Sequence, residues 1–251
     1  MTLVEPGHPR AKSLKIRERL AEGFKAGLVV PEGLAAHGRG EAFDYFLGER
    51  TTSHAREAIR AAVAVLLTGE SPVISVNGNV AALVPSEVVR LADLTGAKLE
   101  VNIYHRSPER ERLIAEHLRN HGAKTVLGTE EEYATKIPEI HSDRRKVDKR
   151  GIASADVVLV PLEDGDRTEA LRKLGKVVIA IDLNPLSRTA QAANITIVDN
   201  IVRALPLMIE EAKALAGTPR EGLLRIFRRY DNGKILRSSI ELMRRRLQEL
   251  E

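Results

Sequence analysis

The polar residues between Val177 and Asn200 follow two apolar runs, 177–181 and 195–198, that have the length of buried β-strands. The groups beyond the two runs are Asp182, Asn184, Ser187 and Arg188, then Asp199 and Asn200. In open α/β sheets, ligands bind beyond the carboxyl ends of the strands, and Asp and Asn side chains suit ribose hydroxyls and adenine edges. We therefore predict that this stretch forms one wall of a binding site. The alternative is that Asp182 and Asn184 only cap the following turn.

Two other strand ends carry groups that suit an anionic ligand. The triplet Asn77-Gly78-Asn79 follows an apolar run, and its glycine permits close approach of the backbone. The pair His105-Arg106 follows a second run and precedes a helix expected to start at Pro108, where free amides and the positive helix end favour a phosphate. We predict that both segments bind substrate. For Arg106, the alternative is a solvated side chain beside an ordinary capped helix.

The segment 37–52, HGRGEAFDYFLGERTT, combines glycines, arginines and aromatic residues. Glycines on both sides of Arg39 let backbone amides and a guanidinium approach a phosphate together. We predict a ligand-binding loop here, preceded by a turn at 29–33. An ordinary surface loop is the alternative.

Several reaction types are disfavoured because their motifs are missing. The chain contains no GxGxxG, GxxxxGK[ST], GxSxG or HExxH motif, and it has no cysteine. His117 and His121 have a spacing that can hold a metal on a helix, but no third ligand is evident, so we expect solvated side chains. What remains is positioning and charge stabilisation, which transfer of a phosphoryl or nucleotidyl group requires. The candidate catalytic residues are Arg39, His105 and Arg106.

The spacing of apolar residues predicts an α/β fold with a mainly parallel, Rossmann-like sheet and helices on both faces. Strands are expected at 72–76, 98–104, 124–127, 156–161, 177–181 and 195–198. Helices are expected at 11–27, 51–68, 86–95, 108–120, 167–174, 201–215 and 220–251, the last with a break at 231–233. The stretch 130–150 is expected to be irregular. We predict one domain, 1–251, with a helical and loop-rich segment 1–70, a core 71–216 and C-terminal helices 217–251.

The composition limits which binding partners and which cellular compartment we expect. The net charge is +4, but basic and acidic residues are interleaved and only 3% of residues are aromatic, which disfavours nucleic-acid binding. No run reaches the about 18 apolar residues that span a bilayer, and the N-terminus has no secretory signal. We expect a cytoplasmic protein without membrane contact. A 29% content of charged residues resembles that of thermophile proteins.

Long segments resemble one known family. They are residues 8–52, which include HGRGEAFDYFLGERTT, residues 75–85 (SVNGNVAALVP), residues 102–123, which begin NIYHRSPERER, and residues 153–200, which include VVIAIDLNPLSR. Together they are similar to archaeal phosphopantothenate synthetases, also named 4-phosphopantoate–β-alanine ligases. The resemblance extends over nearly the whole chain.

This resemblance implies an ATP-dependent, homodimeric amide ligase of coenzyme A biosynthesis. It would join 4-phosphopantoate to β-alanine through an acyl-adenylate and release AMP, diphosphate and 4'-phosphopantothenate. Mg²⁺ would accompany the ATP rather than occupy a protein site. The implied ATP contacts are Arg17, Arg39, Asp182, Leu183, Asn184, Ser187, Arg188, Asp199 and Asn200. We place the substrate phosphate near His105-Arg106 because of their position before a helix start, not because of the resemblance. No residue is evident as the base that would deprotonate the amine.

Three other interpretations stay open at this point. The same strand-end loops would serve a nucleotide-binding regulatory module without turnover. Preference for free pantoate would indicate a pantothenate synthetase. A dehydrogenase is disfavoured by the missing glycine fingerprint.

Overall fold

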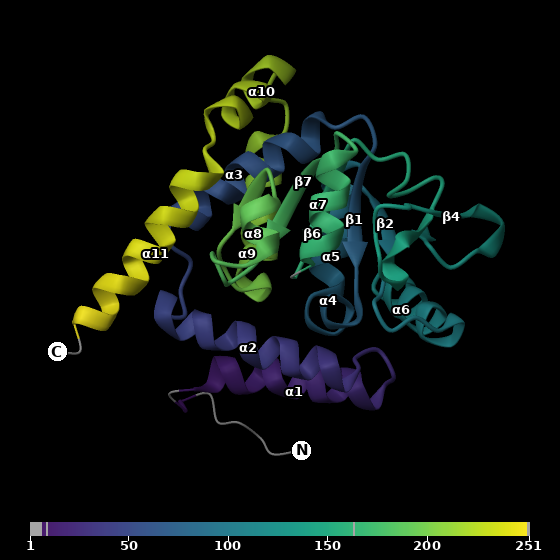
Figure 1. Ribbon diagram of the computed structural model, residues 1–251, viewed down its shortest axis with the longest axis horizontal. Coiled ribbons are helices and arrows are strands. Elements are labelled where there is room, and N and C mark those ends of the chain that lie inside the picture. The colour runs from purple at the N-terminus through teal and green to yellow at the C-terminus, as the bar shows by residue number, and fades with distance from the viewer. Residues whose placement is uncertain (1–6, 9, 163, 250–251) are drawn as a thin grey trace.

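A six-stranded parallel sheet forms the centre of the protein in the computed structural model, which describes residues 7–8, 10–162 and 164–249 (Figure 1). The strand order is β3-β2-β1-β6-β7-β8. The strands are β1 (Pro72–Val76), β2 (Lys98–Val101), β3 (Val126–Leu127), β6 (Val157–Pro161), β7 (Val177–Ile181) and β8 (Ile195–Ile197). The predicted Rossmann-like sheet is thus confirmed, and the crossovers change direction between β1 and β6.

Both faces of the sheet are buried, as its continuous apolar strands require. Val73, Val158 and Val178 pack on one side with Leu171 of α7 (Gly165–Lys173). Alternate residues, Ile74 among them, belong to the larger core on the other side. That core contains α3 (Ser53–Thr68), α5 (Pro85–Thr95), α6 (Pro108–Asn120) and α9 (Ile201–Leu215). Figure 1 shows α7 and α3 on opposite sides of β7, which confirms helices on both faces.

Local signals set two helix starts: α6 starts at Pro108 as predicted, and α3 starts at Ser53, two residues after the predicted position. The Thr52 side chain accepts a hydrogen bond from the Ala55 amide at the start of α3. Ser107 accepts one from the Arg110 amide at 3.2 Å, and Pro108 opens α6. The remaining helices are α1 (Ala11–Lys25), α2 (Pro31–Leu47), α4 (Gly78–Leu83), α8 (Arg188–Ala192), α10 (Arg220–Arg229) and α11 (Asn232–Gln248).

The predicted loop around Arg39, and the turn before it, are wrong. Pro31 is the first residue of α2, which continues through Gly38 and Gly40 and ends at Gly48 in a left-handed conformation, φ 87°. Each helical glycine costs about 1 kcal/mol relative to alanine. Burial of Leu47 and the ion pairs of Glu41 with Arg17 and of Asp44 with Arg203 offset that cost.

Two other elements depart from the prediction. Helix α4 begins one residue after Asn77, whose side chain accepts from the Val80 amide at 3.0 Å. The charged stretch 130–150 contains an antiparallel hairpin, β4 (Ala134–Lys136) with β5 (Lys146–Asp148), which pairs only with itself.

Figure 1 shows α1 and α2 lying side by side across the sheet edge where the strands end. The C-terminal helix α11 contacts α2, α3 and β8. Residues 1–6, part of the segment in which we found no secretory signal, and residues 250–251 lie outside the described residues.

Candidate functional site

A cavity of about 480 Å³ lies between α2 and the carboxyl ends of the strands. It sits where the crossovers change direction, which is the usual ligand position in this architecture. The predicted residues that line it are Arg39, Asn77, Gly78, Asn79, His105, Asp182, Leu183, Asn184, Arg188, Asp199 and Asn200. Eleven residues from five separate segments are thus brought together.

Helix α2 spans the cavity between two anchors. Near its start, the Gly33 carbonyl accepts a hydrogen bond from Asn79 Nδ2 at 2.8 Å. Near its end, Asp44 accepts from Asn200 Nδ2 at 3.1 Å and from Arg203 of α9. One end of the cavity therefore lies beside β1 and the other beside β8.

The β7–β8 end is rich in carboxylate and amide groups. Asp182 is buried, and its Oδ1 accepts from the Asn184 amide at 2.9 Å. Its Oδ2 accepts from the Ser187 hydroxyl, and Ser187 in turn caps α8 by accepting from the Ala190 amide. Asp182 and Asn184 thus stabilise the following turn, as the alternative interpretation of the sequence expected. They also line the cavity.

Asp199 lines the cavity, but both of its carboxylate oxygens accept hydrogen bonds within the protein. Its Oδ2 accepts from the Thr51 hydroxyl at 2.6 Å, and its Oδ1 accepts from the Asn200 amide and from Arg203. Burial raises the pKa of the Asp199 carboxyl, and the Arg203 charge opposes this effect. Asp199 therefore ties the α2–α3 connection to the end of β8.

The β1–β2 end brings two guanidinium groups together. Arg110 donates to the Leu28 and His105 carbonyls at 3.0 and 2.8 Å, and Arg144 comes from the turn before β5. Both line the cavity beside the exposed Tyr104. Burial lowers the pKa of Arg110, and the positive charge of Arg144 lowers it further. Two like charges at a cavity wall favour an anionic ligand.

Gly78, which follows β1, packs closely against Arg110 and the Leu28 carbonyl. A side chain at Gly78 would place its Cβ 2.0 Å from the Leu28 carbonyl oxygen and 2.7 Å from Arg110 Nη2. Glycine at this position is therefore needed for the close approach of three segments.

Three predicted site residues do not line the cavity. Arg17 of α1 donates to both carboxylate oxygens of Glu41 on α2. Ser187 lies behind Asp182 as the cap of α8. Arg106 forms an ion pair with Glu111 and donates to the Gly128 and Lys146 carbonyls, so it joins the chain segments behind the cavity.

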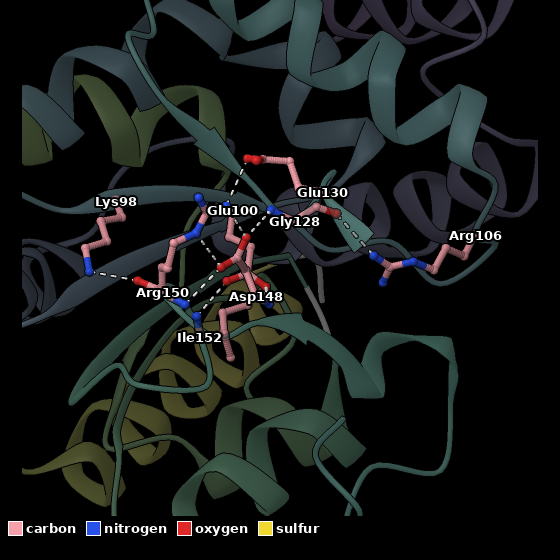
Figure 2. A network of polar contacts seen from close by, with 8 residues as sticks. All are labelled: Lys98, Glu100, Arg106, Gly128, Glu130, Asp148, Arg150 and Ile152. Atoms are coloured by element: carbon pink, nitrogen blue, oxygen red, sulfur yellow. Dashed lines mark hydrogen bonds and ion pairs between the residues drawn. The ribbon is translucent and has the colours of Figure 1, made fainter. Parts of the chain in front are cut away.

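The segment that carries Arg144 is fastened to the sheet by a buried carboxylate (Figure 2). Glu100 of β2 accepts from the amides of Asp148 and Ile152 at 3.0 and 2.6 Å. Asp148 accepts in turn from the Gly128 amide and from the Arg150 side chain. Burial raises the pKa of Glu100 to about 7. This network fixes 128–152 against the edge of the sheet.

Sequence reasoning missed several polar groups that line the cavity, among them Arg110, Arg144 and Asp164, and it did not single out His37 within the predicted segment 37–52. Arg110 lies three residues into a helix that was predicted to face an anion, so its position was a usable signal. His37 lies on α2, and burial lowers its pKa, so the ring is neutral at pH 7. Within the described ranges, no group of three or more His, Asp or Glu residues is placed to hold a metal ion.

Comparison with known proteins decides the family. The family model described as phosphopantothenate/pantothenate synthetase matches residues 54–246. The chain belongs to this family. The prediction drawn from the sequence motifs is therefore confirmed.

Full-length relatives of the synthetase family agree with this assignment. A protein of Thermococcus kodakarensis named 4-phosphopantoate–β-alanine ligase is 54% identical over 251 residues, covering all of this chain and 95% of the relative. A protein of the same name from Thermococcus onnurineus is 53% identical with the same coverage. A third, from Methanosarcina mazei, is 51% identical over 250 residues and is covered to 98%. The predicted enzyme class, a carbon–nitrogen ligase, is confirmed.

Among residues 7–8, 10–162 and 164–249, no helix is both long enough and apolar enough to cross a bilayer.

Proposed function

We propose that this chain condenses 4-phosphopantoate with β-alanine at the expense of ATP, giving 4'-phosphopantothenate, AMP and diphosphate in coenzyme A biosynthesis. The names of relatives 51–54% identical over the whole chain support the two substrates. The observation that carries the proposal is the cavity at the strand ends, which has Asp182, Asn184 and Asn200 toward one end and the guanidinium groups of Arg110 and Arg144 toward the other.

ATP is proposed to occupy the β7–β8 end. The oxygen and amide groups of Asp182, Asn184 and Asn200 suit a ribose and an adenine edge. Arg39 and Arg188 line the same cavity and would face the phosphates. Mg²⁺ would enter with the triphosphate, because in such sites it is held by substrate phosphates, water and one or two carboxylates rather than by a cage of protein groups.

The phosphate of 4-phosphopantoate is proposed to bind between Arg110 and Arg144. Our sequence reasoning placed it near His105-Arg106. Arg106 is engaged with Glu111 behind the cavity, whereas the two missed arginines line the cavity itself. Arg144 Nη1 is buried and has no hydrogen-bond partner in the described part of the chain. A phosphate oxygen would satisfy it, which favours the phosphorylated acid over free pantoate.

The reaction follows from the weak electrophilicity of a carboxylate. The carboxylate oxygen of 4-phosphopantoate attacks the α-phosphorus of ATP, the bond to the bridging oxygen breaks, and diphosphate leaves. The β-alanine nitrogen then attacks the acyl carbon, the bond to AMP breaks, and the nitrogen loses a proton. The protein positions the reactants along α2 and stabilises developing negative charge through its arginines.

One incubation tests the proposal. The chain is mixed with ATP, Mg²⁺, 4-phosphopantoate and β-alanine, and AMP and 4'-phosphopantothenate are quantified, with free pantoate as the parallel substrate. Equal formation of AMP and product is expected. ATP binding without AMP would instead indicate a regulatory nucleotide-binding module, and preference for pantoate would indicate a pantothenate synthetase.

We also propose that the ligase is a cytoplasmic homodimer. Tyr45 and Phe46 of α2 and Ile240 and Leu247 of α11 are exposed hydrophobic side chains on helices that touch each other. Such apolar surface is typical of an interface. Light scattering should give twice the mass of one chain, and a mass of one chain would contradict the dimer.

A further inference from the structure

Arg167 of α7 is 1% exposed and is the largest fully buried side chain in the described part of the chain. Its Nη1 donates to the Ser75 hydroxyl at 2.7 Å and to Asn102 Oδ1 at 2.8 Å. Its Nε lies 2.9 Å from Asp164 Oδ2. The guanidinium therefore links β1, the end of β2 and the start of α7 beneath the cavity.

Burial of this charge is costly for stability. Moving a charged group out of water costs several kcal/mol, and apolar side chains of similar volume are often as stable or more stable in such places. Burial accordingly lowers the pKa of Arg167 to about 10, a value at which the group is still charged at pH 7. Because the buried charge of Arg167 lowers stability, we expect this residue to have a functional role in addition to packing.

The contacts of Arg167 lead to Arg144 by two routes. Asp164 Oδ2, which pairs with Arg167, also lies 3.1 Å from Arg144 Nε. Asn102, which accepts from Arg167, donates through Nδ2 to the Arg144 carbonyl at 3.1 Å and to the Lys146 carbonyl at 3.0 Å. The first route holds the Arg144 side chain and the second holds its backbone.

We infer that Arg167 is a positioning residue that aims the Arg144 guanidinium into the cavity for the phosphate of the acid substrate. The inference rests on the proposed function, because that function supplies the phosphate. Without Arg167, Asp164 would lose one of its two cationic partners and Asn102 would lose the donor that orients its amide. Arg144 would then sample other orientations, and the anion would bind less tightly while ATP, at the far end of α2, would be unaffected.

The test compares direct binding in matched variants by titration calorimetry. Arg167→Met removes the charge at similar volume, and Leu171→Ala creates a cavity in the same helix, away from the site. We expect Arg167→Met to weaken 4-phosphopantoate binding about tenfold, as for loss of a charge-assisted hydrogen bond, and to change ATP binding less than twofold. Leu171→Ala should lower the melting temperature and leave both affinities unchanged.

A double variant gives the decisive comparison. Once Arg144→Ala has removed the guanidinium, adding Arg167→Met should weaken 4-phosphopantoate binding no further. Additive losses, or equal effects of Arg167→Met and Leu171→Ala on both ligands, would overturn the inference. If Arg167→Met does not fold, Asp164→Asn breaks the first route and should give the same selective loss; unchanged binding would again overturn it.

Measuring 4-phosphopantoate binding apart from AMP formation distinguishes a failure of this inference from a failure of the proposed function. A wild-type chain that binds 4-phosphopantoate but makes no AMP would refute the proposed reaction and leave the positioning role intact. A productive ligase in which Arg167→Met binds the acid normally would refute only the positioning role. A wild-type chain that does not bind the acid would refute both.

Discussion

Arg203 of α9 donates from Nη2 to Asp44 of α2 at 2.6 Å, and this ion pair fastens α2, which forms one wall of the cavity, to the end of the sheet. The Asp44 carboxylate is 6% exposed, so it is largely shielded from water. The same Nη2 lies 2.6 Å from Asp199, which follows β8. One guanidinium therefore sets how far α2 lies from the strand ends.

We expect Asp44→Ala to loosen α2. The substitution removes one of the two carboxylates that face Arg203 and the acceptor of the Asn200 amide, but Arg203 keeps Asp199. The cost should therefore stay below the value of about 3–5 kcal/mol for a fully uncompensated buried charge. Hydrogen exchange of the α2 amides should accelerate and the KM for ATP should rise. Arg60→Ala is the matched control, because the Arg60–Glu211 pair is exposed and contributes about 0.2–1 kcal/mol. Equal effects of the two substitutions would contradict an anchoring role for Asp44.

Replacement of Asp182 by Asn tests whether this residue binds ATP as well as capping a turn. Asparagine keeps an oxygen for the Asn184 amide, so stability should change little. Loss of the charge should weaken ATP binding about tenfold, measured by calorimetry.

The control for this substitution is Asp231→Ala, which removes the cap of α11 away from the cavity. It should cost about 1 kcal/mol of stability without altering ATP binding. If Asp182→Asn behaves like this control and only its melting temperature moves, Asp182 has a capping role alone.

Strands and caps were predictable because their signals are local. The run Val177–Ile181 is apolar because both sheet faces are covered, and Thr52 and Ser107 cap helices through residues three positions away. Helix α2 was not predictable, because its glycines favour a loop and the contacts that hold it come from Arg203, far along the chain. Arg144 was missed for a similar reason. Contacts from Glu100, Asn102 and Asp164, distant in the sequence, bring it to the cavity.

We expect Arg39→Ala to lose most of the ligase activity while the fold survives. Arg39 is exposed on α2 and lines the cavity, so the core does not depend on its side chain. Loss of a charge-assisted phosphate contact costs about 1.5–3 kcal/mol in binding, and more if the contact tightens in the transition state. Steady-state kinetics with varied ATP measure the effect, and circular dichroism checks the fold. Unchanged kinetics would show that Arg39 does not contact the nucleotide.

The stability of the chain should fall as pH rises through the titration of Glu100. Its pKa is about 7 in the folded chain, against 4.5 ordinarily, chiefly because burial disfavours the ionised form. The folded state therefore holds the proton more tightly than the unfolded chain does. This stabilising contribution is fully present below about pH 4.5 and is lost between about pH 4.5 and 7, where the shift corresponds to about 3 kcal/mol.

Glu100→Gln isolates this contribution, because the variant shares every other titrating group but cannot ionise at position 100. Its amide presents an N–H group to one of the two backbone donors, Asp148 or Ile152, so it should be less stable than the wild type at pH 5. Urea unfolding at pH 5 and pH 8 should show that deficit shrinking by about 3 kcal/mol at the higher pH, because only the wild type bears the cost of a buried charge. A deficit that stays constant, or grows with pH, would mean that Glu100 is already ionised at pH 5 and that the backbone amides of the Arg144-bearing segment stabilise its charge.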